Sequence, residues 1–393
     1  MRMTHTVLHG DKMLPARVQV PQRRAWSRPS DTHRLPCHRL GATRSSHAYV
    51  LAVDLFHPDL SMEMGKWAIE NVVHSDDRVI LCNVVVVPPV SVFTQPDGTL
   101  VTAADVLEAL TKNDEIESQM EERMKEFELT LSKNVGTGRR FETRVVADPD
   151  ILTAMVTSDK RAVTDILDMQ VREIGADSCT LLLAATCHGG LAELLTGSIA
   201  AGSVRRSAAD AVIVYRTAKK RNLVGSENRK IVVPVDESEL SQQALTWIAT
   251  HIARKGDLVK LLHVVPSVPW LLPTPTLGLS PAALLLGTEV EERNLTQATE
   301  YITTHLVPIL EEHHIDYEID STVQITDGST ENLGKKLLDH ARDAHLIVIG
   351  SASHGGINEF VFGSLANYLD HHASIPVIVV HGAHDRFTPH TSL

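Results

Sequence analysis

A short segment occurs twice in this chain, and the internal repeat constrains the fold more than any other feature of the sequence. Residues 187–198 read CHGGLAELLTGS, and residues 353–364 read SHGGINEFVFGS. The same offset relates the apolar runs that follow the two segments, Ala211–Val214 and Val377–Val380. Repetition at a fixed spacing predicts two copies of one structural unit.

The similarity extends to the start of each half of the chain. Residues 49–54 (YVLAVD) and residues 230–236 (KIVVPVD) are both short β-rich runs that end in aspartate, and a tryptophan-containing helical stretch follows each. A chain of 393 residues is long enough for two domains of about 150 residues each. We therefore predict a basic, disordered tail over residues 1–46, a first domain over 47–216, a linker over 217–228, a second domain over 229–382 and a short tail over 383–393.

Apolar runs alternate with amphipathic segments in both halves. In the second half, Ser238 is a candidate N-cap for a helix with apolar residues at every fourth position, and further elements are expected over 282–310, 317–324, 330–342 and 346–349. In the first half, a long connection over 88–113 is expected to precede a helix with apolar positions from Ile116 to Leu131. Nearly continuous apolar strands between helices predict an α/β fold, with an open parallel sheet covered by helices on both faces of each domain.

The composition excludes several classes of protein. The net charge is −12 although residues 1–46 are rich in arginine, so the folded body is acidic and we expect no nucleic-acid partner. No apolar run approaches the roughly 18 residues of a membrane span, so we expect no membrane partner. The four cysteines form no C-x-x-C pair, and the N-terminus has no apolar signal-peptide core. We expect buried thiols and a cytoplasmic protein, with an organelle as the alternative if the basic tail is a transit peptide.

Candidate functional residues lie where two strands of the second half end. Asp236 ends the first strand, and Gly350 directly follows the fourth, and ligands bind beyond such strand ends where the strand order reverses. The loop after Gly350 returns to Gly363 and Ser364 at the start of a helix, whose N–H groups and dipole favour an anion. A phosphate chain is the natural ligand. Because the loop supplies no lysine, we expect amides and Mg²⁺ to meet its charge.

These residues resemble the universal stress protein family, whose ATP-binding members carry Gly-x-x-Gly-x9-Gly-Ser/Thr after the fourth strand. The resemblance covers residues 47–216 and 229–382 and implies two tandem Rossmann-like domains of the adenine-nucleotide α-hydrolase-like type. It implies that Asp236 lies by the adenosine, that the backbone around Val264 and Val265 lines the adenine, and that the loop glycines cradle phosphate. The candidate site residues are Pro234, Asp236, Val264, Val265, Gly350, Ser351, Ser353, His354, Gly355, Gly363 and Ser364.

Both halves depart from the family pattern. Ser353 replaces one glycine of three in the second half, whereas Ala184 and Cys187 replace both leading glycines in the first. A Cβ atom at both positions would crowd a phosphate or forbid a positive φ. We therefore expect the second half to bind ATP and the first half to be structural.

The leading functional hypothesis is an ATP-binding stress-response or regulatory protein with slow or no hydrolysis, since no general base is recognisable. No P-loop or G-x-G-x-x-G fingerprint is present, and the histidine pairs lack the spacing of a zinc framework, so we expect no metal site beyond Mg²⁺. The alternative is a nucleotide-independent interaction scaffold, and a true enzyme of the same fold group is less favoured. We expect the last strands to join the halves as an intramolecular pseudo-dimer, and a homodimer stays open.

Overall fold

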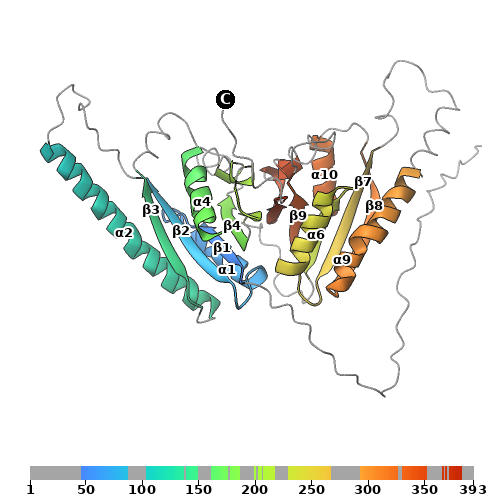
Figure 1. Cartoon of the computed structure of the whole chain (residues 1–393), viewed down its shortest axis with the longest axis horizontal. Helices are drawn as coiled ribbons and strands as arrows, with labels where there is room; N and C mark the ends of the chain where they lie inside the picture. Colours follow the sequence, from blue (N-terminus) through green and yellow to red (C-terminus); the bar gives the residue numbers. More distant parts are fainter. Residues whose placement is uncertain are drawn as a thin grey trace, which may run out of the picture. The chain divides into compact units, whose positions relative to one another are not determined.

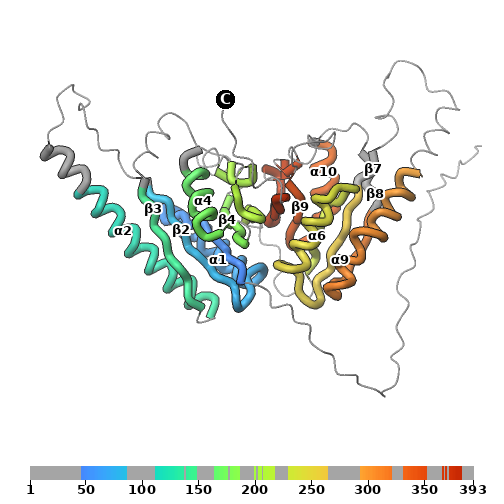
Figure 2. Tube along the Cα trace, in the orientation of Figure 1, coloured from blue at the N-terminus to red at the C-terminus, as the bar shows by residue number. Residues whose placement is uncertain are grey.

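The structure is a computed structural model, and Figure 2 follows the course of its chain. It describes residues 46–86, 103–136, 139–148, 161–175, 178–185, 229–266, 293–325 and 330–351, with residues 199–216 apart from 201 and 206, and residues 365–382 apart from 367 and 370. Residues 46–393 belong to one compact unit. Below, "first half" denotes residues 46–216 and "second half" residues 229–382.

The described strands form one ten-stranded sheet with the order β3-β2-β1-β4-β5-β10-β9-β6-β7-β8. The first half supplies β1 (Ala48–Ala52), β2 (Arg78–Val86), β3 (Glu142–Asp148), β4 (Cys179–Ala185) and β5 (Ala211–Arg216), and the second half supplies β6 (Lys230–Val235), β7 (Leu258–Pro266), β8 (Asp316–Ile325), β9 (Leu346–Gly350) and β10 (Val377–Val380). Neighbouring strands within each half are parallel. The halves join where β5 and β10 pair antiparallel, with Val214 opposite Val377.

Helices cover both faces of this sheet (Figure 1). Those with defined bounds are α1 (Pro58–Asn71), α2 (Ala103–Val135), α4 (Arg161–Ile174), α6 (Glu239–His251), the π-turn η2 (Ile302–Leu306), α9 (Val307–Glu312) and α10 (Thr330–His340). The described residues within 199–205, 293–301 and 365–372 are also helical. One core contains side chains of α1, α2, α6 and α9, and the other contains those of α4 and α10. Strand β1 serves both, since Tyr49 and Leu51 enter the first core and Val50 the second. The chain is therefore an α/β protein with a large, mostly parallel sheet.

Most of the elements expected from the sequence are present, but the connection predicted over residues 88–113 was drawn too long at its end. Helix α2 already begins at Ala103, so residues 103–113 are helical. The segment AADVLEAL carries strong helix formers without glycine or proline, and this local preference outweighs the turn-forming residues before it. The expected helix over 282–310 is helical from residue 293, and residues 282–292 lie outside the described part.

Polar contacts reinforce the boundary between the halves at the carboxyl ends of α1 and α6. The Arg254 guanidinium donates to the Glu70 carbonyl oxygen at 2.6 Å, and the Arg229 guanidinium donates to the Asn71 carbonyl oxygen. In return, Nε2 of His74 lies 3.1 Å from the His251 carbonyl oxygen. Each half thus donates hydrogen bonds to carbonyl oxygens at the end of a helix in the other half. Such carbonyl groups have no partner within their own helix.

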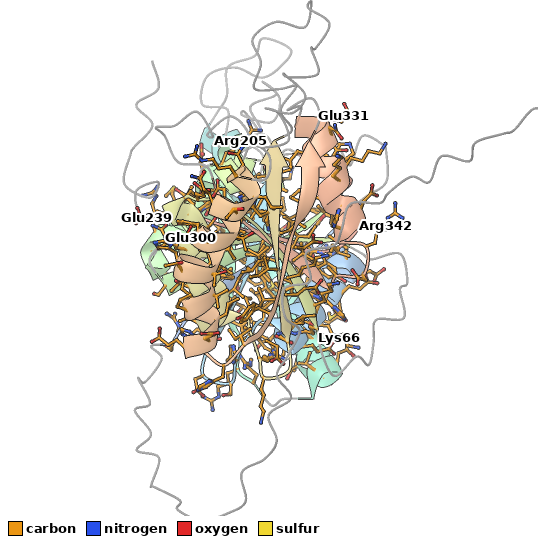
Figure 3. The ribbon with its side chains drawn as sticks, turned by 90° about the vertical axis from the view of Figure 1, so that its right-hand side faces the viewer. Lys66, Arg205, Glu239, Glu300, Glu331 and Arg342 are labelled. Carbon is orange, nitrogen blue, oxygen red and sulfur yellow. The ribbon has the colours of Figure 1, made fainter. Side chains whose placement is uncertain are left out.

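Two of the cysteines lie in the described part, as free thiols buried in β2 and β4. Burial raises the pKa of Cys82 and of Cys179 to about 12, so both are inert thiols as the sequence predicted. Charged side chains such as Glu239, Glu300 and Arg342 lie at the periphery and point away from the sheet (Figure 3). Among the described helices, none has the length and apolar character needed to cross a bilayer.

Candidate functional site

The strand order of the second half reverses between β6 and β9, and the candidate residues Asp236 and Gly350 lie there. The chain runs outward through β6, β7 and β8 and then returns to place β9 on the other side of β6. Val232 is opposite Ile347, and continuing this parallel register brings Val235 level with Gly350. Asp236 and Gly350 therefore meet at the carboxyl edge of the sheet, as the sequence predicted.

Asp236 anchors the turn that leads from β6 into α6. Its Oδ1 accepts hydrogen bonds from the Ser238 amide at 3.1 Å, from the Ser238 hydroxyl and from the Ser241 hydroxyl at 2.7 Å. Ser238 is the N-cap of α6, and its Oγ accepts from the Ser241 amide, which confirms the predicted cap. All these contacts use Oδ1, so Oδ2 is the carboxylate oxygen that remains for a ligand within the described residues.

Gly350 is glycine for a packing reason that the sequence did not reveal. A Cβ atom at this position would lie 3.2 Å from Leu240 Cβ and 3.4 Å from the Leu240 carbonyl oxygen. Its φ lies outside the left-handed region, since the described glycines with positive φ are Gly136, Gly175 and Gly256. The missing side chain thus allows the end of β9 to approach the first turn of α6 closely.

The remaining predicted residues divide into those that the structure places and those outside its described part. Pro234 is buried in β6 opposite Leu262, and Val264 and Val265 lie in β7 opposite Val323 and Gln324 of β8. The pairing of β7 with β8 shifts register between Leu262 and Val264, which re-aims the backbone at the end of β7. Ser351 is described, and its amide donates to the Val380 carbonyl oxygen at 2.7 Å, so that amide serves the sheet. The loop residues Ser353, His354, Gly355, Gly363 and Ser364 lie outside the described residues.

Sequence reasoning missed His263, which lies in β7 opposite Val235, next to Asp236. Its side chain is 9% exposed, and its Nδ1 is buried with no hydrogen-bond partner among the described residues. Burial lowers the pKa of His263, although the nearby Glu237 and Asp236 carboxylates act in the opposite direction. A buried polar atom without a partner destabilises a fold, so His263 Nδ1 is a candidate ligand contact at this edge. The signal in the sequence was a histidine near the end of a strand whose other polar residue is Lys260.

The equivalent edge of the first half is already occupied by its own side chains. Asp54 Oδ1 accepts from the amides of Phe56 and His57, and Asp54 Oδ2 lies 2.9 Å from Nδ1 of His57. Asn83, at the position in β2 that matches His263, donates its amide to the Val53 carbonyl oxygen at 2.7 Å. The first-half counterparts of Asp236 Oδ2 and of the His263 side chain, namely Asp54 Oδ2 and Asn83, therefore already have hydrogen-bond partners.

The fold defines an α/β protein with a large, mostly parallel sheet, and a comparison with known protein families gives a match in its second half. Residues 227–381 match the sequence model of the Universal stress protein family. This half of the chain therefore carries a universal stress protein domain.

Two curated relatives and one solved structure have the same family name. A universal stress protein of Mycolicibacterium smegmatis is 31% identical over 165 residues, covering 40% of this chain and 51% of the relative. A universal stress protein of Mycobacterium tuberculosis is 24% identical over 207 residues, covering 53% of this chain and 63% of the relative. The chain thus spans between about half and two thirds of the length of these relatives. The crystal structure of a universal stress protein from Archaeoglobus fulgidus covers 85% of this chain and 96% of its own at 14% identity, with a TM-score of 0.45.

Proposed function

We propose that the second half of this chain binds ATP, accompanied by Mg²⁺, at the edge formed by β6, β7 and β9. The observation that carries the proposal is Asp236, whose Oδ1 holds the turn while Oδ2 remains for a ribose hydroxyl. The nearby Nδ1 of His263, buried without a partner among the described residues, supplies a contact for the nucleoside. Gly350 allows β9 to approach α6 closely, and the loop that would bind the phosphates follows it. The remaining glycines of this loop and Ser364 would donate hydrogen bonds to the phosphates.

The proposed role is regulatory, in the stress response that the family name indicates. In this role the nucleotide biases the conformation or association of the chain, and hydrolysis is slow or does not occur. The three hydrogen bonds to Oδ1 orient the Asp236 carboxylate, and burial lowers the pKa of His263 and so favours a neutral imidazole that can hydrogen-bond to the nucleoside.

A second candidate function, a nucleotide-independent interaction scaffold, is favoured by the pairing of β5 with β10. This pairing joins the edge strands of the two halves into one sheet and buries what would otherwise be two exposed edges. In that case the two halves would act as an intramolecular pseudo-dimer of similar domains. Mass spectrometry of small molecules released from gently purified protein separates the candidates, since the scaffold carries no adenine nucleotide.

A matched pair of variants tests the site itself. Asp236→Asn keeps an oxygen for Ser238 and Ser241 while replacing Oδ2 with an amide, and Asp54→Asn makes the same change in the first half. Losing a charge-assisted hydrogen bond of about 1.5–3 kcal/mol should weaken ATP binding by tenfold or more in Asp236→Asn. Calorimetric titration with ATP and Mg²⁺ should show almost no change for Asp54→Asn. Equal affinities for both variants would refute the proposed site.

A further inference from the structure

Three potential metal ligands meet at the boundary between the halves, away from the proposed nucleotide edge. His47 directly precedes β1, Asp210 directly precedes β5, and His251 ends α6. One ligand atom from each lies within 4.8 Å of the other two. His47 and Asp210 are buried and His251 is half-buried, so the cluster is largely shielded from bulk water. We propose that these three residues form a site for a zinc-class divalent cation that ties the two halves together.

His47 and Asp210 are linked through Thr180 rather than by a direct hydrogen bond, since Nε2 of His47 lies 2.8 Å from the Thr180 hydroxyl, which donates to Asp210. Nε2 of His47 lies 3.6 Å from Oδ2 of Asp210, which is longer than the usual 2.7–3.2 Å of an N–H···O bond. In a tetrahedral zinc site with metal–ligand bonds of about 2.0–2.1 Å, two ligand atoms lie about 3.3 Å apart. A cation between these atoms would need a small contraction and would replace the contact of His47 Nε2 with the Thr180 hydroxyl.

Hydrogen bonds with neighbouring groups orient the proposed ligands. Nδ1 of His251 lies 3.1 Å from the Trp247 carbonyl oxygen and donates to it in the tautomer that carries the lone pair on Nε2. The Asp210 carboxylate accepts from the Thr180 hydroxyl at 2.9 Å through Oδ1 and from Nε1 of Trp247 at 3.2 Å through Oδ2. These neutral donors fix the carboxylate without cancelling its charge.

Ring contacts position the two histidines relative to each other. The rings of His47 and His251 have centroids 4.5 Å apart, and the ring of Trp247 stacks on that of His251 at 5.1 Å with an interplanar angle of 23°. Two imidazoles and one carboxylate are ligands that zinc accepts, and water would complete the tetrahedron. Since His47 and Asp210 belong to the first half and His251 to the second, binding would stabilise their association.

The test uses the full chain, stripped of metal with a chelator and titrated with Co²⁺ and then Zn²⁺. We expect one Co²⁺ per chain with the visible absorption of tetrahedral coordination, displacement by Zn²⁺, and a zinc-dependent rise in the thermal unfolding temperature. His251→Gln keeps a helix-forming residue and should weaken this binding at least about a hundredfold.

A matched control tests whether Co²⁺ binds to histidines outside the cluster. His313 also ends a helix with its Nδ1 close to the carbonyl oxygen four residues before it, at 2.9 Å, but is exposed and lies outside the cluster. His313→Gln should bind Co²⁺ like the unaltered protein. Asp210→Asn provides a second test if His251→Gln does not fold. Its Co²⁺ binding is measured by the same visible absorption and should be weakened as well. Absence of a tetrahedral Co²⁺ spectrum in the unaltered protein, or its persistence in folded His251→Gln or Asp210→Asn, would overturn the proposal.

Discussion

The two halves of this chain build the same strand-to-helix turn with different consequences for a ligand. Asp54 and Asp236 each follow the first strand of their half. The Asp54 amide donates a hydrogen bond to the Ser61 hydroxyl at 2.9 Å, and the Asp236 amide donates one to the Ser241 hydroxyl at the same distance. In the first half His57 then occupies Asp54 Oδ2, whereas all described contacts of the Asp236 carboxylate use Oδ1. A shared fold therefore preserves the turn, while single neighbouring residues decide whether its carboxylate is available for binding.

The largest stability difference is expected at the aspartates that precede the second strands. Asp257 pairs with the buried Arg229 guanidinium through both carboxylate oxygens, whereas Asp77 accepts the amides of His47 and His74. Asp257→Ala leaves a buried cation without its carboxylate and should cost about 3–5 kcal/mol of unfolding free energy. Asp77→Ala should cost about 1–3 kcal/mol, because it removes hydrogen bonds of neutral amides. Urea unfolding of both variants measures the difference, and a larger loss in Asp77→Ala would contradict the comparison.

A smaller difference is expected where a glycine lets two helices pack closely on the face that α4 and α10 cover. A Cβ at Gly334 of α10 would lie 2.1 Å from the Tyr368 ring, and a Cβ at Gly202 would lie 2.9 Å from the Thr164 hydroxyl. Gly334→Ala should therefore destabilise the protein by about 1–3 kcal/mol through overpacking. Gly202→Ala should change stability less, since a threonine side chain can rotate and alanine favours the helix by about 1 kcal/mol. Thermal unfolding of the two variants tests this order, which equal losses would contradict.

The smallest effect concerns pH and separates His263 from Asn83, its counterpart in the first half. Burial lowers the pKa of His263, so below about pH 6.5 the unfolded chain binds a proton that the folded protein takes up less readily. The unfolding free energy should therefore fall as the pH falls through this range. His263→Asn, which copies the first half, should make that fall shallower. Urea unfolding between about pH 5 and pH 8 measures both slopes. Identical slopes would show that His263 does not titrate as its burial indicates.

The sequence predicted the elements that local patterns determine and failed where a contact joins distant residues. Alternating apolar runs predicted the strands, and Ser238 predicted the start of α6, because strand periodicity and helix caps are local properties. The start of α2 was wrong because the turn residues before Ala103 were given more weight than the helix formers after it. The positions of Asp236 and Gly350 at the ends of two strands predicted their meeting, since parallel strands share a carboxyl edge.

Other parts of the two candidate sites could not be found in the same way. The close approach of Gly350 to Leu240 depends on the packing of α6, which no pattern near Gly350 encodes. The cluster takes His47 from before β1, Asp210 from before β5 and His251 from the end of α6, so a search for ligands that are close in sequence misses it. Its members are brought together by the pairing of β5 with β10 and the packing of α6.

The number of nucleotides bound per chain tests the difference between the halves most directly. Equilibrium dialysis of the full chain against ATP and Mg²⁺, at concentrations well above the dissociation constant, gives this number without any substitution. The account predicts one ATP per chain, bound by the second half, because the first half has engaged both oxygens of Asp54 and replaced the leading loop glycines. Two ATP molecules per chain, or none, would contradict it.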